Sequence, residues 1–320
     1  MMLSFFYELY TKKIGVGNPI FWGIRYKSLL RVVVRSVVQI LMPIYYRLNK
    51  RRLNPDGNLI EGRNKRIIVS MTSFPARINS VWQVIESLMH QSLQPDMIIL
   101  YLSKEQFPNL FFSLPSNLIK LQERGLKIVF VEDDIRSHKK YYYVFQEYPN
   151  DLIITVDDDI FYHPQTIESL YNKYIETKGG VIANQTAIIK YINEELLPYS
   201  SWSIDKKISS EAILPRLQIG VGGVLYEPTT LYKDVLNIEL ALELCPLADD
   251  IWLNVMTRLN KLQVYATSLS LIYLPVYIKK NTTLCSINNG QNMNDKQIKQ
   301  VRDYYCEHLK IDVYSNKKYV

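Results

Sequence analysis

Short apolar runs alternate with amphipathic stretches from about residue 66 onward. The runs have strand length and are rich in β-branched residues, and helical 3.6-residue patterns separate them. Strands are predicted at residues 66–71, 97–102, 127–131, 152–156, 181–189, 263–266 and 271–277. Helices are predicted from residue 79 or 80 to 89, at 115–124 and 139–147, from residue 164, up to residue 259, and in the Lys-rich C-terminal part. This alternation predicts an α/β fold with a mostly parallel sheet flanked by helices on both faces.

The N-terminal segment has a different pattern. From residue 27 to 48 a polar residue recurs at every fourth position within an otherwise apolar stretch, which predicts an amphipathic helical extension. These polar residues are Lys27, Arg31, Arg35 and Gln39. They interrupt the apolar stretch too often for a comfortable membrane span of about 20 residues, so we expect a helix that lies in the interface of an anionic membrane. The alternative is a helix packed on the protein's own core.

The positive charge of the chain is concentrated in that same segment. Residues 1–60 contain ten Lys or Arg against two acidic residues, a net charge of +8. The remainder contains 28 basic and 29 acidic residues, a net charge of −1, so a nucleic-acid groove across the main domain is not expected. We expect headgroup contacts from Arg47, Lys50, Arg51 and Arg52.

A turn-rich stretch at residues 54–58 predicts a domain boundary. We therefore divide the chain into a membrane-associating segment with its linker, residues 1–60, and a globular domain, residues 61–320. The second part is expected to be soluble and to bind its ligand without the first. No small-residue cleavage site follows the apolar stretch, so a secretory signal is not expected.

Three adjacent carboxylates, Asp157, Asp158 and Asp159, directly follow the strand predicted at residues 152–156. Adjacent carboxylates repel one another, and open α/β sheets bind ligands at the carboxyl ends of their strands. On an extended backbone Asp157 and Asp159 share one side and Asp158 faces the other. Two hard oxygen ligands suit Mn²⁺ or Mg²⁺, so Asp157 and Asp159 are the candidate metal ligands. The alternative is a solvated acidic turn.

Two further features follow along the chain. A glycine-rich segment with Gly222, Gly223 and Tyr226 permits close backbone approach to a ligand or a sharp bend. Asp249 and Asp250 begin a predicted helix, where the helix dipole favours acids whatever their function.

The cysteines and two of the histidines show no ligand pattern. Cys245, Cys285 and Cys306 are an odd, widely spaced set, as expected of reduced thiols in a cytosolic protein. His163 and His308 are interpreted as structural or surface residues.

Taken together, these segments resemble the GT-A-fold glycosyltransferases of the bacterial family 2-like type. The resemblance covers roughly residues 66–305 and rests on Ser-Met-Thr-Ser-Phe-Pro-Ala-Arg at 70–77, Gln-Pro-Asp at 94–96, the triplet, Gly-Gly-Val-Leu-Tyr at 222–226 and Ala-Asp-Asp-Ile-Trp at 248–252. A D-x-D sequence alone is frequent by chance. Its order and spacing with the other segments are much more specific.

The resemblance implies a nucleotide-sugar donor, with a UDP-sugar favoured, bound by the first half of the domain. The implied donor contacts are Thr72, Ser73, Arg77, Asp134, Lys139, Lys140 and Asp157, with Asp158 a weaker choice. It implies a glycan or lipid-linked acceptor on the side of Gly222, Gly223, Tyr226 and Trp252. Lysines near a helix start are also commonly solvated, so Lys139 and Lys140 have an alternative interpretation.

The implied reaction is sugar transfer in surface polysaccharide or glycolipid synthesis at the inner face of the plasma membrane. An inverting enzyme needs a carboxylate base for the acceptor hydroxyl, and the candidates are Asp250, slightly preferred, and Asp249. A nucleotidyltransferase is an alternative, although it normally has a glycine-rich phosphate loop after the first strand, where this chain has Thr-Ser-Phe-Pro-Ala-Arg. A non-catalytic sugar-binding, membrane-associated protein is a second alternative.

Overall fold

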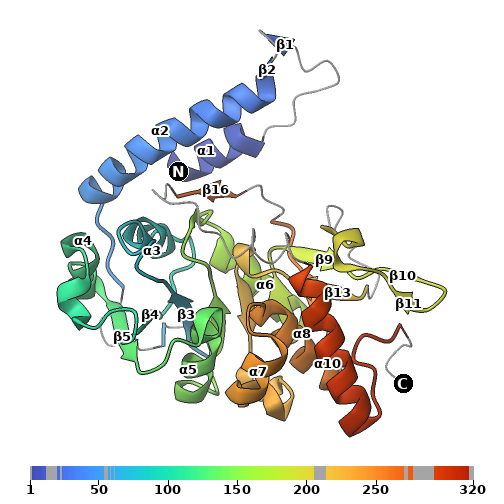
Figure 1. Ribbon diagram of the computed structural model, residues 1–320. Helices are drawn as coiled ribbons and strands as arrows, with labels where there is room; N and C mark the ends of the chain where they lie inside the picture. The colour runs from blue at the N-terminus through green and yellow to red at the C-terminus, as the bar shows by residue number, and fades with distance from the viewer. Residues whose placement is uncertain are drawn as a thin grey trace.

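A seven-stranded, mostly parallel sheet forms the centre of the molecule (Figure 1). The computed structural model describes residues 2–11, 20–21, 24–53, 57, 59–60, 62–204, 214–269, 273–276 and 292–316. The strands of the sheet are β3 (Ile67–Thr72), β4 (Met97–Ser103), β5 (Leu126–Val131), β6 (Leu152–Thr155), β8 (Val181–Ala183), β14 (Val224–Tyr226) and β15 (Val264–Ala266). Their order is β15-β8-β14-β6-β3-β4-β5, and only β14 runs antiparallel to its neighbours. The predicted α/β class with a mostly parallel sheet is confirmed.

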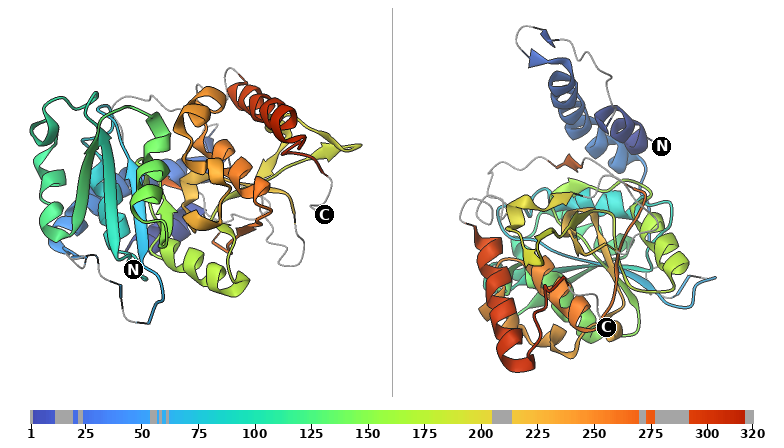
Figure 2. Two further views of the ribbon diagram at one scale, coloured as in Figure 1. Left: turned by 90° about the horizontal axis from the view of Figure 1, so that it is seen from below. Right: turned by 90° about the vertical axis from the view of Figure 1, so that its right-hand side faces the viewer.

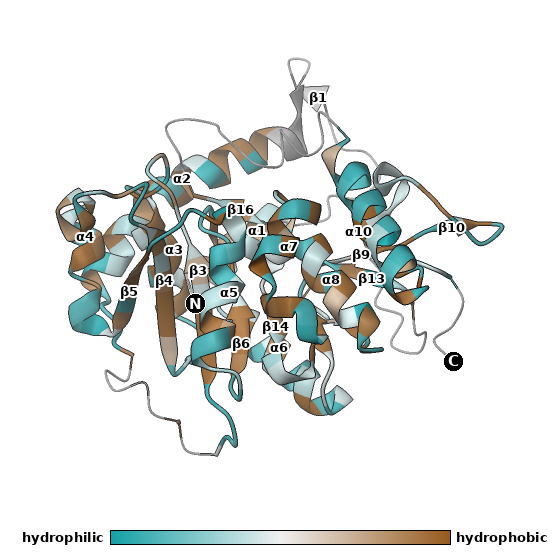
Figure 3. Cartoon of the chain, turned by 60° about the horizontal axis from the view of Figure 1, so that its bottom comes forward, coloured by the Kyte–Doolittle hydropathy of each residue, from teal (hydrophilic) through white to brown (hydrophobic). Residues whose placement is uncertain are grey.

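Helices cover both faces of the sheet because its strands are apolar on both sides. Figure 3 shows β4, β5 and β6 in brown, the colour of hydrophobic residues. Side chains alternate along β3, so Ile67 and Val69 join one hydrophobic cluster and Ile68 joins the other. The described α-helices of the body are α3 (Val81–Met89), α4 (Ser116–Ile119), α5 (Lys139–Glu147), α6 (Thr166–Thr177), α7 (Ile238–Leu244), α8 (Asp249–Leu259) and α10 (Met293–Leu309).

Three predicted elements differ from the observed ones. The strand predicted at 181–189 is split, and its second half, β9 (Thr186–Ile188), pairs with β12 (Ser203–Ile204) and β13 (Arg216–Gln218) in a separate sheet. The helix predicted at 115–124 is α4 followed by a 3₁₀ turn, Gln122–Arg124, that ends at Gly125 with φ of 100°. Of the strand predicted at 271–277, residues 271, 272 and 277 lie outside the described residues, and β16 (Leu274–Pro275) pairs with β7 (Ile160–Phe161). A further short hairpin joins β10 (Tyr191–Ile192) to β11 (Glu195–Leu196).

Two helices precede the body of the molecule, α1 (Met2–Thr11) and α2 (Tyr26–Leu48), with a short β1 (Ile20–Phe21) and β2 (Ile24–Arg25) pair between them. The predicted helical extension is therefore present, and Figures 1 and 2 show it lying beside β16 and extending beyond the body. The side chain of Lys27 lies outside the described ones. Val34, Val38 and Met42, one residue per turn of α2, are buried in the same hydrophobic cluster as β3 and α3.

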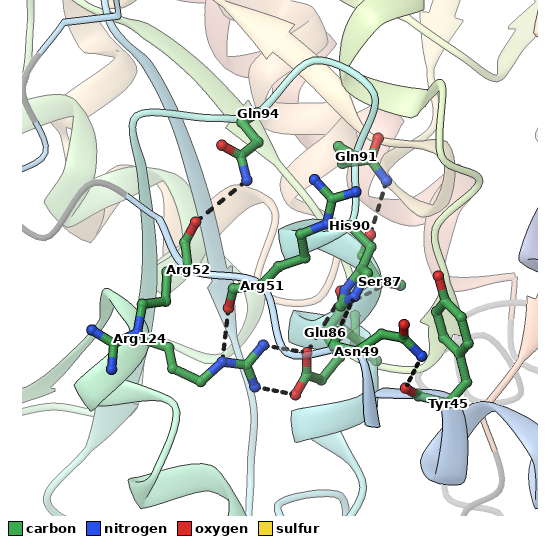
Figure 4. A network of polar contacts seen from close by, with 11 residues as sticks. Tyr45, Asn49, Arg51, Arg52, Glu86, Ser87, His90, Gln91, Gln94 and Arg124 are labelled. Atoms are coloured by element: carbon green, nitrogen blue, oxygen red, sulfur yellow. Dashed lines mark hydrogen bonds and ion pairs between the residues drawn. The ribbon is translucent and has the colours of Figure 1, made fainter. Parts of the chain in front are cut away.

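The segment after α2 is held against the body by its backbone (Figure 4). The carbonyl of Arg51 accepts a hydrogen bond from Arg124 Nε at 2.7 Å, and Arg124 in turn pairs with Glu86 of α3. The carbonyl of Asn49 lies 2.7 Å from Nε2 of His90. Of the predicted linker at 54–58 only Gly57 is described. Residues of α1 and α2 also belong to the same hydrophobic cluster as residues of the body.

Candidate active site

The predicted acidic triplet lies where two neighbouring parallel strands end. β3 and β6 are adjacent and parallel, and the chain connections run in opposite directions from this pair, toward β4 on one side and β14 on the other. Open α/β sheets bind their ligands at such a reversal, outside the carboxyl ends of the strands, and we call this part of the molecule the crevice. The backbone N–H of Val156 donates to the carbonyl of Ser70, so the ends of the two strands are held in register. The triplet and the loop after β3 therefore meet in this crevice.

Asp158 joins the triplet to the loop after β3. Its carboxylate accepts hydrogen bonds from Ser73 Oγ at 2.6 Å and from Arg77 Nη1 at 2.5 Å, and its side chain is only 7% exposed. Burial raises the pKa of Asp158, and the neighbouring Arg77 guanidinium opposes that rise. Asp158 thus holds the triplet against the loop after β3.

Asp157 and Asp159 are more open, with side chains 33% and 27% exposed. The expected difference in exposure between Asp158 and its neighbours is present, but Asp158 and Asp159 lie in a bend after β6 and not on an extended strand. Arg77 Nη1 lies 3.0 Å from Asp159 Oδ2, so Arg77 is shared by two members of the triplet. Arg77, which the resemblance implies as a donor contact, is thus engaged in two ion pairs within the protein.

Lys140 joins the triplet to the second acidic pair. From the first turn of α5 its Nζ lies 3.0 Å from Asp157 Oδ1 and 2.9 Å from Asp249 Oδ2. Its side chain is 6% exposed, so these carboxylates replace the water that a free ammonium would bind. Burial acts to lower the pKa of Lys140, but Asp157 and Asp249 raise it well above its ordinary value. Lys140 is therefore a buried cation between two carboxylates rather than a solvated lysine.

Asp250 lies next to this cluster at the start of α8. It is half-buried, and its Oδ2 accepts a hydrogen bond from the backbone N–H of Gly220 at 3.0 Å. Burial, together with the charge of Asp249, raises the pKa of Asp250 to about 7. Asp249 is instead paired with Lys140. The two adjacent acids thus have different environments, one an ion pair and one a carboxyl that titrates near neutrality.

Gly220 is a site residue that sequence reasoning missed. A Cβ at this position would lie 3.0 Å from Asp250 Oδ1 and 3.1 Å from Lys140 Nζ, closer than most real Cβ contacts. Gly220 belongs to the same glycine-rich segment, from which the sequence analysis names only Gly222 and Gly223 as candidate ligand contacts. A Cβ on Gly222 would lie 2.3 Å from the Tyr273 hydroxyl, and Gly223 has φ of 83°. These two glycines therefore allow close chain packing and the turn into β14.

Tyr162 is a second missed residue. Its hydroxyl accepts a hydrogen bond from the backbone N–H of Asp157 at 2.7 Å, which closes the turn that contains the triplet. A tyrosine five residues after a carboxylate has no distinctive spacing, so no sequence signal pointed to it.

The other predicted donor residues lie toward the β5 edge of the sheet. Asp134 pairs with Lys139 and accepts a hydrogen bond from Gln106 Nε2 at 2.6 Å. Thr72 Oγ1 donates to the carbonyl of Tyr101 at 2.9 Å, which ties the end of β3 to β4. Lys139 and Lys140 are adjacent in sequence but belong to separate ion pairs.

Two residues expected on the acceptor side are in the core. Tyr226 and Trp252 are both 0% exposed and belong to the hydrophobic cluster of α5, α8 and α10. The indole N–H of Trp252 donates to the carbonyl of Val235. Neither side chain has a surface through which to contact an acceptor, because sheet and helix packing cover both.

Two histidines pack against aromatic rings. His163 is 9% exposed and its ring contacts the ring of Tyr7, and His308 stacks on Tyr304 in α10. Cys245 and Cys306 are free thiols, and Cys285 lies outside the described residues.

A divalent metal fits the two open carboxylates. Asp157 and Asp159 are the more exposed carboxylates of the triplet, and each is paired with one cation, Lys140 and Arg77 respectively. Mg²⁺ or Mn²⁺ bound by two such carboxylates would complete its shell with phosphate and water. Within the described parts of the chain, no group of three or more His, Cys, Asp and Glu side chains is arranged to hold a metal. Two protein ligands therefore suit a metal shared with a phosphorylated substrate better than a closed structural site.

No protein-family model matches this chain, and no curated protein matches it. Among solved structures it is similar to the mannosyltransferase PcManGT from Pyrobaculum calidifontis in complex with GDP-Man and Mn²⁺, at 9% identity over 87% of this chain and 75% of that chain, with a TM-score of 0.46. It is also similar to S. aureus TarS 1-349 in complex with UDP-GlcNAc, at 12% identity over 77% and 73%, with a TM-score of 0.44. A third is CMP:2-keto-3-deoxy-manno-octonic acid synthetase complexed with CTP, at 10% identity over 72% and 99%, with a TM-score of 0.42. At these identities and TM-scores, what the chain does has to be inferred from its own residues.

Proposed function

We propose that this protein is a metal-dependent glycosyltransferase of the GT-A type. It moves a sugar from a nucleotide-sugar donor, with a UDP-sugar favoured, to a glycan or lipid-linked acceptor in surface polysaccharide or glycolipid synthesis. The observation that carries the proposal is the position of Lys140, whose Nζ lies within 3.0 Å of carboxylates from both Asp157 and Asp249. Lys140 thus connects Asp157, a candidate metal ligand, to Asp249, one of the two candidate bases.

The first half of the crevice is assigned to the donor. Asp157 and Asp159 would hold Mn²⁺ or Mg²⁺, which when bound stabilises the negative charge that develops on a departing nucleoside diphosphate. Ser73 and Arg77 hold Asp158, and with it the wall of the crevice. Donor contacts from Thr72, Asp134 and Lys139 remain part of the proposal, at the β5 edge of the sheet.

The second half is assigned to the acceptor. Asp250 is the better candidate base because its pKa, raised to about 7, suits proton acceptance near neutral pH. Asp249 is instead engaged in an ion pair with Lys140. The Gly220 N–H fixes one oxygen of Asp250 and leaves the carboxyl oriented. Gly222 and Gly223 shape the neighbouring backbone.

We place the enzyme on the cytoplasmic side, peripheral on the inner face of the plasma membrane. The residues of α2 from Leu29 to Leu48 make a helix long and apolar enough to cross a membrane. However, Val34, Val38 and Met42 are buried against the body, which favours a helix lying along the surface. The opposite side of α2 is exposed and apolar, and we call it the outward face: Leu29, Val32, Val33, Ile40, Leu41, Ile44 and Leu48.

Charge favours an anionic bilayer as the partner of the outward face. Arg47, Lys50, Arg51 and Arg52 are exposed at the C-terminal end of the same helix and just after it. A second copy of the chain would bring two such basic ends together, whereas anionic headgroups neutralise them. Ile40→Asp with Ile44→Asp should weaken binding to phosphatidylserine-containing vesicles by tenfold or more, because each isoleucine loses its apolar contact.

Ile175→Asp is the matched control for this test, since Ile175 is 56% exposed on α6 and away from α2. It should bind vesicles like the natural chain. A chain that is dimeric in solution and does not bind vesicles would contradict the membrane assignment.

The test of the catalytic proposal is a panel of nucleotide sugars incubated with the full chain and Mn²⁺, with free nucleoside diphosphate as the readout. Release from one donor that stops on chelation of the metal is expected. Pyrophosphate released from a nucleoside triphosphate and a sugar phosphate would favour a nucleotidyltransferase. Metal-independent binding of a sugar without turnover would favour a non-catalytic sugar-binding protein.

A further inference from the structure

Helix α1 contacts the turn that contains the acidic triplet, and helix α2 contacts the strand that pairs with this turn. We call residues 157–163 the triplet loop. On the side away from β3 this loop is bounded by β16, whose Leu274 and Pro275 pair with Phe161 and Ile160. The backbone N–H of Val276 donates to the carbonyl of Asp159 at 2.8 Å. A residue of the candidate metal site is thus held directly by the β16 segment.

Helix α1 contacts both sides of this short pairing through one side chain. Tyr7 is 1% exposed, and its hydroxyl donates to the carbonyl of Phe161 while accepting from the N–H of Leu274 at 3.4 Å. Its ring packs edge-on against His163, with the centroids 5.2 Å apart. Tyr7 therefore joins β7, β16 and the end of the triplet loop at a single point.

Helix α2 contacts the same pairing from the other helix of the extension. Gln39 Nε2 donates to the carbonyl of Pro275 at 2.6 Å. Pro275 pairs with Ile160, the residue that follows Asp159. Gln39 is one of the polar residues that recur at every fourth position of α2, and in the fold its side chain binds the backbone of β16.

A two-residue pairing of strands supplies little stability of its own. The position of the triplet loop therefore depends on contacts from outside it, and Tyr7 and Gln39 supply two that are buried or half-buried. A typical intramolecular hydrogen bond contributes about 0.5–1.5 kcal/mol, which corresponds to roughly a two- to tenfold change in a local opening equilibrium.

We propose that Tyr7 and Gln39 are positioning residues for the candidate metal site, so that α1 and α2 are part of the catalytic unit and not a detachable anchor. The catalytic part of this inference rests on the proposed function. It also implies that the outward face of α2 and the support of the triplet loop lie on different sides of one helix. Contact with the bilayer and the geometry of the triplet are thus joined within α2.

The direct test is hydrogen–deuterium exchange of the full chain without metal, read in peptides that cover residues 157–163 and 273–276. Tyr7→Phe and Gln39→Met should each speed exchange there by roughly two- to tenfold, and the double variant by more. Tyr10→Phe is the matched control, because Tyr10 is also buried on α1 but stacks under Arg31 and not on β7. Its exchange should match that of the natural chain.

A second readout is the Mn²⁺ concentration that gives half-maximal donor turnover. It should rise roughly two- to tenfold in Tyr7→Phe and in Gln39→Met, with the KM for donor at saturating Mn²⁺ little changed. Folded variants with natural exchange in both peptides would overturn the inference. If the natural chain turns over no donor, the proposed function fails while the exchange experiment still decides the positioning role.

Discussion

Lys140 Nζ lies 2.9 Å from Asp249 Oδ2, a contact that connects the first turn of α5 to the first turn of α8. The same ammonium group also pairs with Asp157 at 3.0 Å. Because the side chains of Lys140 and Asp249 are largely removed from water, removing the cation would leave the buried Asp249 carboxylate without its counter-charge. This contact holds the two acidic groups of the crevice together.

Lys140→Met is therefore expected to destabilise the fold and abolish transfer. Breaking a buried pair by removing one partner costs about 3–5 kcal/mol. The measurement is the free energy of unfolding by denaturant. Lys127→Met is the control, since Lys127 makes an exposed pair with Glu147 that should contribute at most about 1 kcal/mol. Equal stability losses in the two variants would contradict the role given to Lys140.

Asp249→Asn and Asp250→Asn should separate by their kinetics. Asp250→Asn keeps an oxygen that can accept from Gly220 but loses the base, so kcat should fall by about 10²–10⁴ while nucleotide binding persists. Asp249→Asn weakens the pairing of Lys140, so it should lower stability by roughly 1–3 kcal/mol, less than full loss of a buried pair. Transfer at the natural rate in both variants would show that neither Asp249 nor Asp250 is the base.

The rate of transfer should depend on the protonation of Asp250. Burial and the Asp249 charge raise its pKa to about 7, so the carboxyl is protonated and unable to accept a proton below that pH. We expect kcat/KM to rise about tenfold per pH unit below about 7 and to level off above it. In Asp249→Asn one cause of the raised pKa is gone, and the acid limb should move to lower pH. A limb that moves to higher pH would contradict the assignment.

Removal of residues 1–48 should impair folding of the remainder. It would expose the part of the hydrophobic cluster that Tyr7, Val38 and Met42 now cover. The prediction is a large loss of soluble protein, or a melting temperature well below that of the full chain. A truncated chain that is soluble, melts like the full chain and binds donor would contradict this prediction and support the domain boundary expected near residue 60.

The central elements of the fold could be predicted from local pattern. The runs that form β3, β4, β5 and β6 are mostly apolar, as buried parallel strands are, and the triplet marks the end of one of them. The greater burial of Asp158 relative to its two neighbours also follows the expected difference between them. These features depend on residues close in sequence, which is why pattern sufficed.

The rest depends on contacts between distant segments. Nothing in the spacing of Lys140 indicates that it lies between Asp157 and Asp249, because the fold alone brings α5 and α8 together. The strand β14 has only three residues and directly follows two glycines, so the local pattern indicates a glycine-rich ligand contact and not a strand. Trp252 is expected on the acceptor side because it follows the acidic pair. Its position in α8 places its side chain in the core instead.

The measurement that tests the account most directly is calorimetric binding of UDP to the full chain with and without Mn²⁺. GDP and CMP serve as further nucleotides, and a variant with both Asp157→Asn and Asp159→Asn serves as the comparison. The account predicts that Mn²⁺ strengthens binding of at least one nucleotide in the natural chain and has no such effect in the variant. Nucleotide binding that is absent throughout, or unchanged by Mn²⁺ and by the two substitutions, would contradict it.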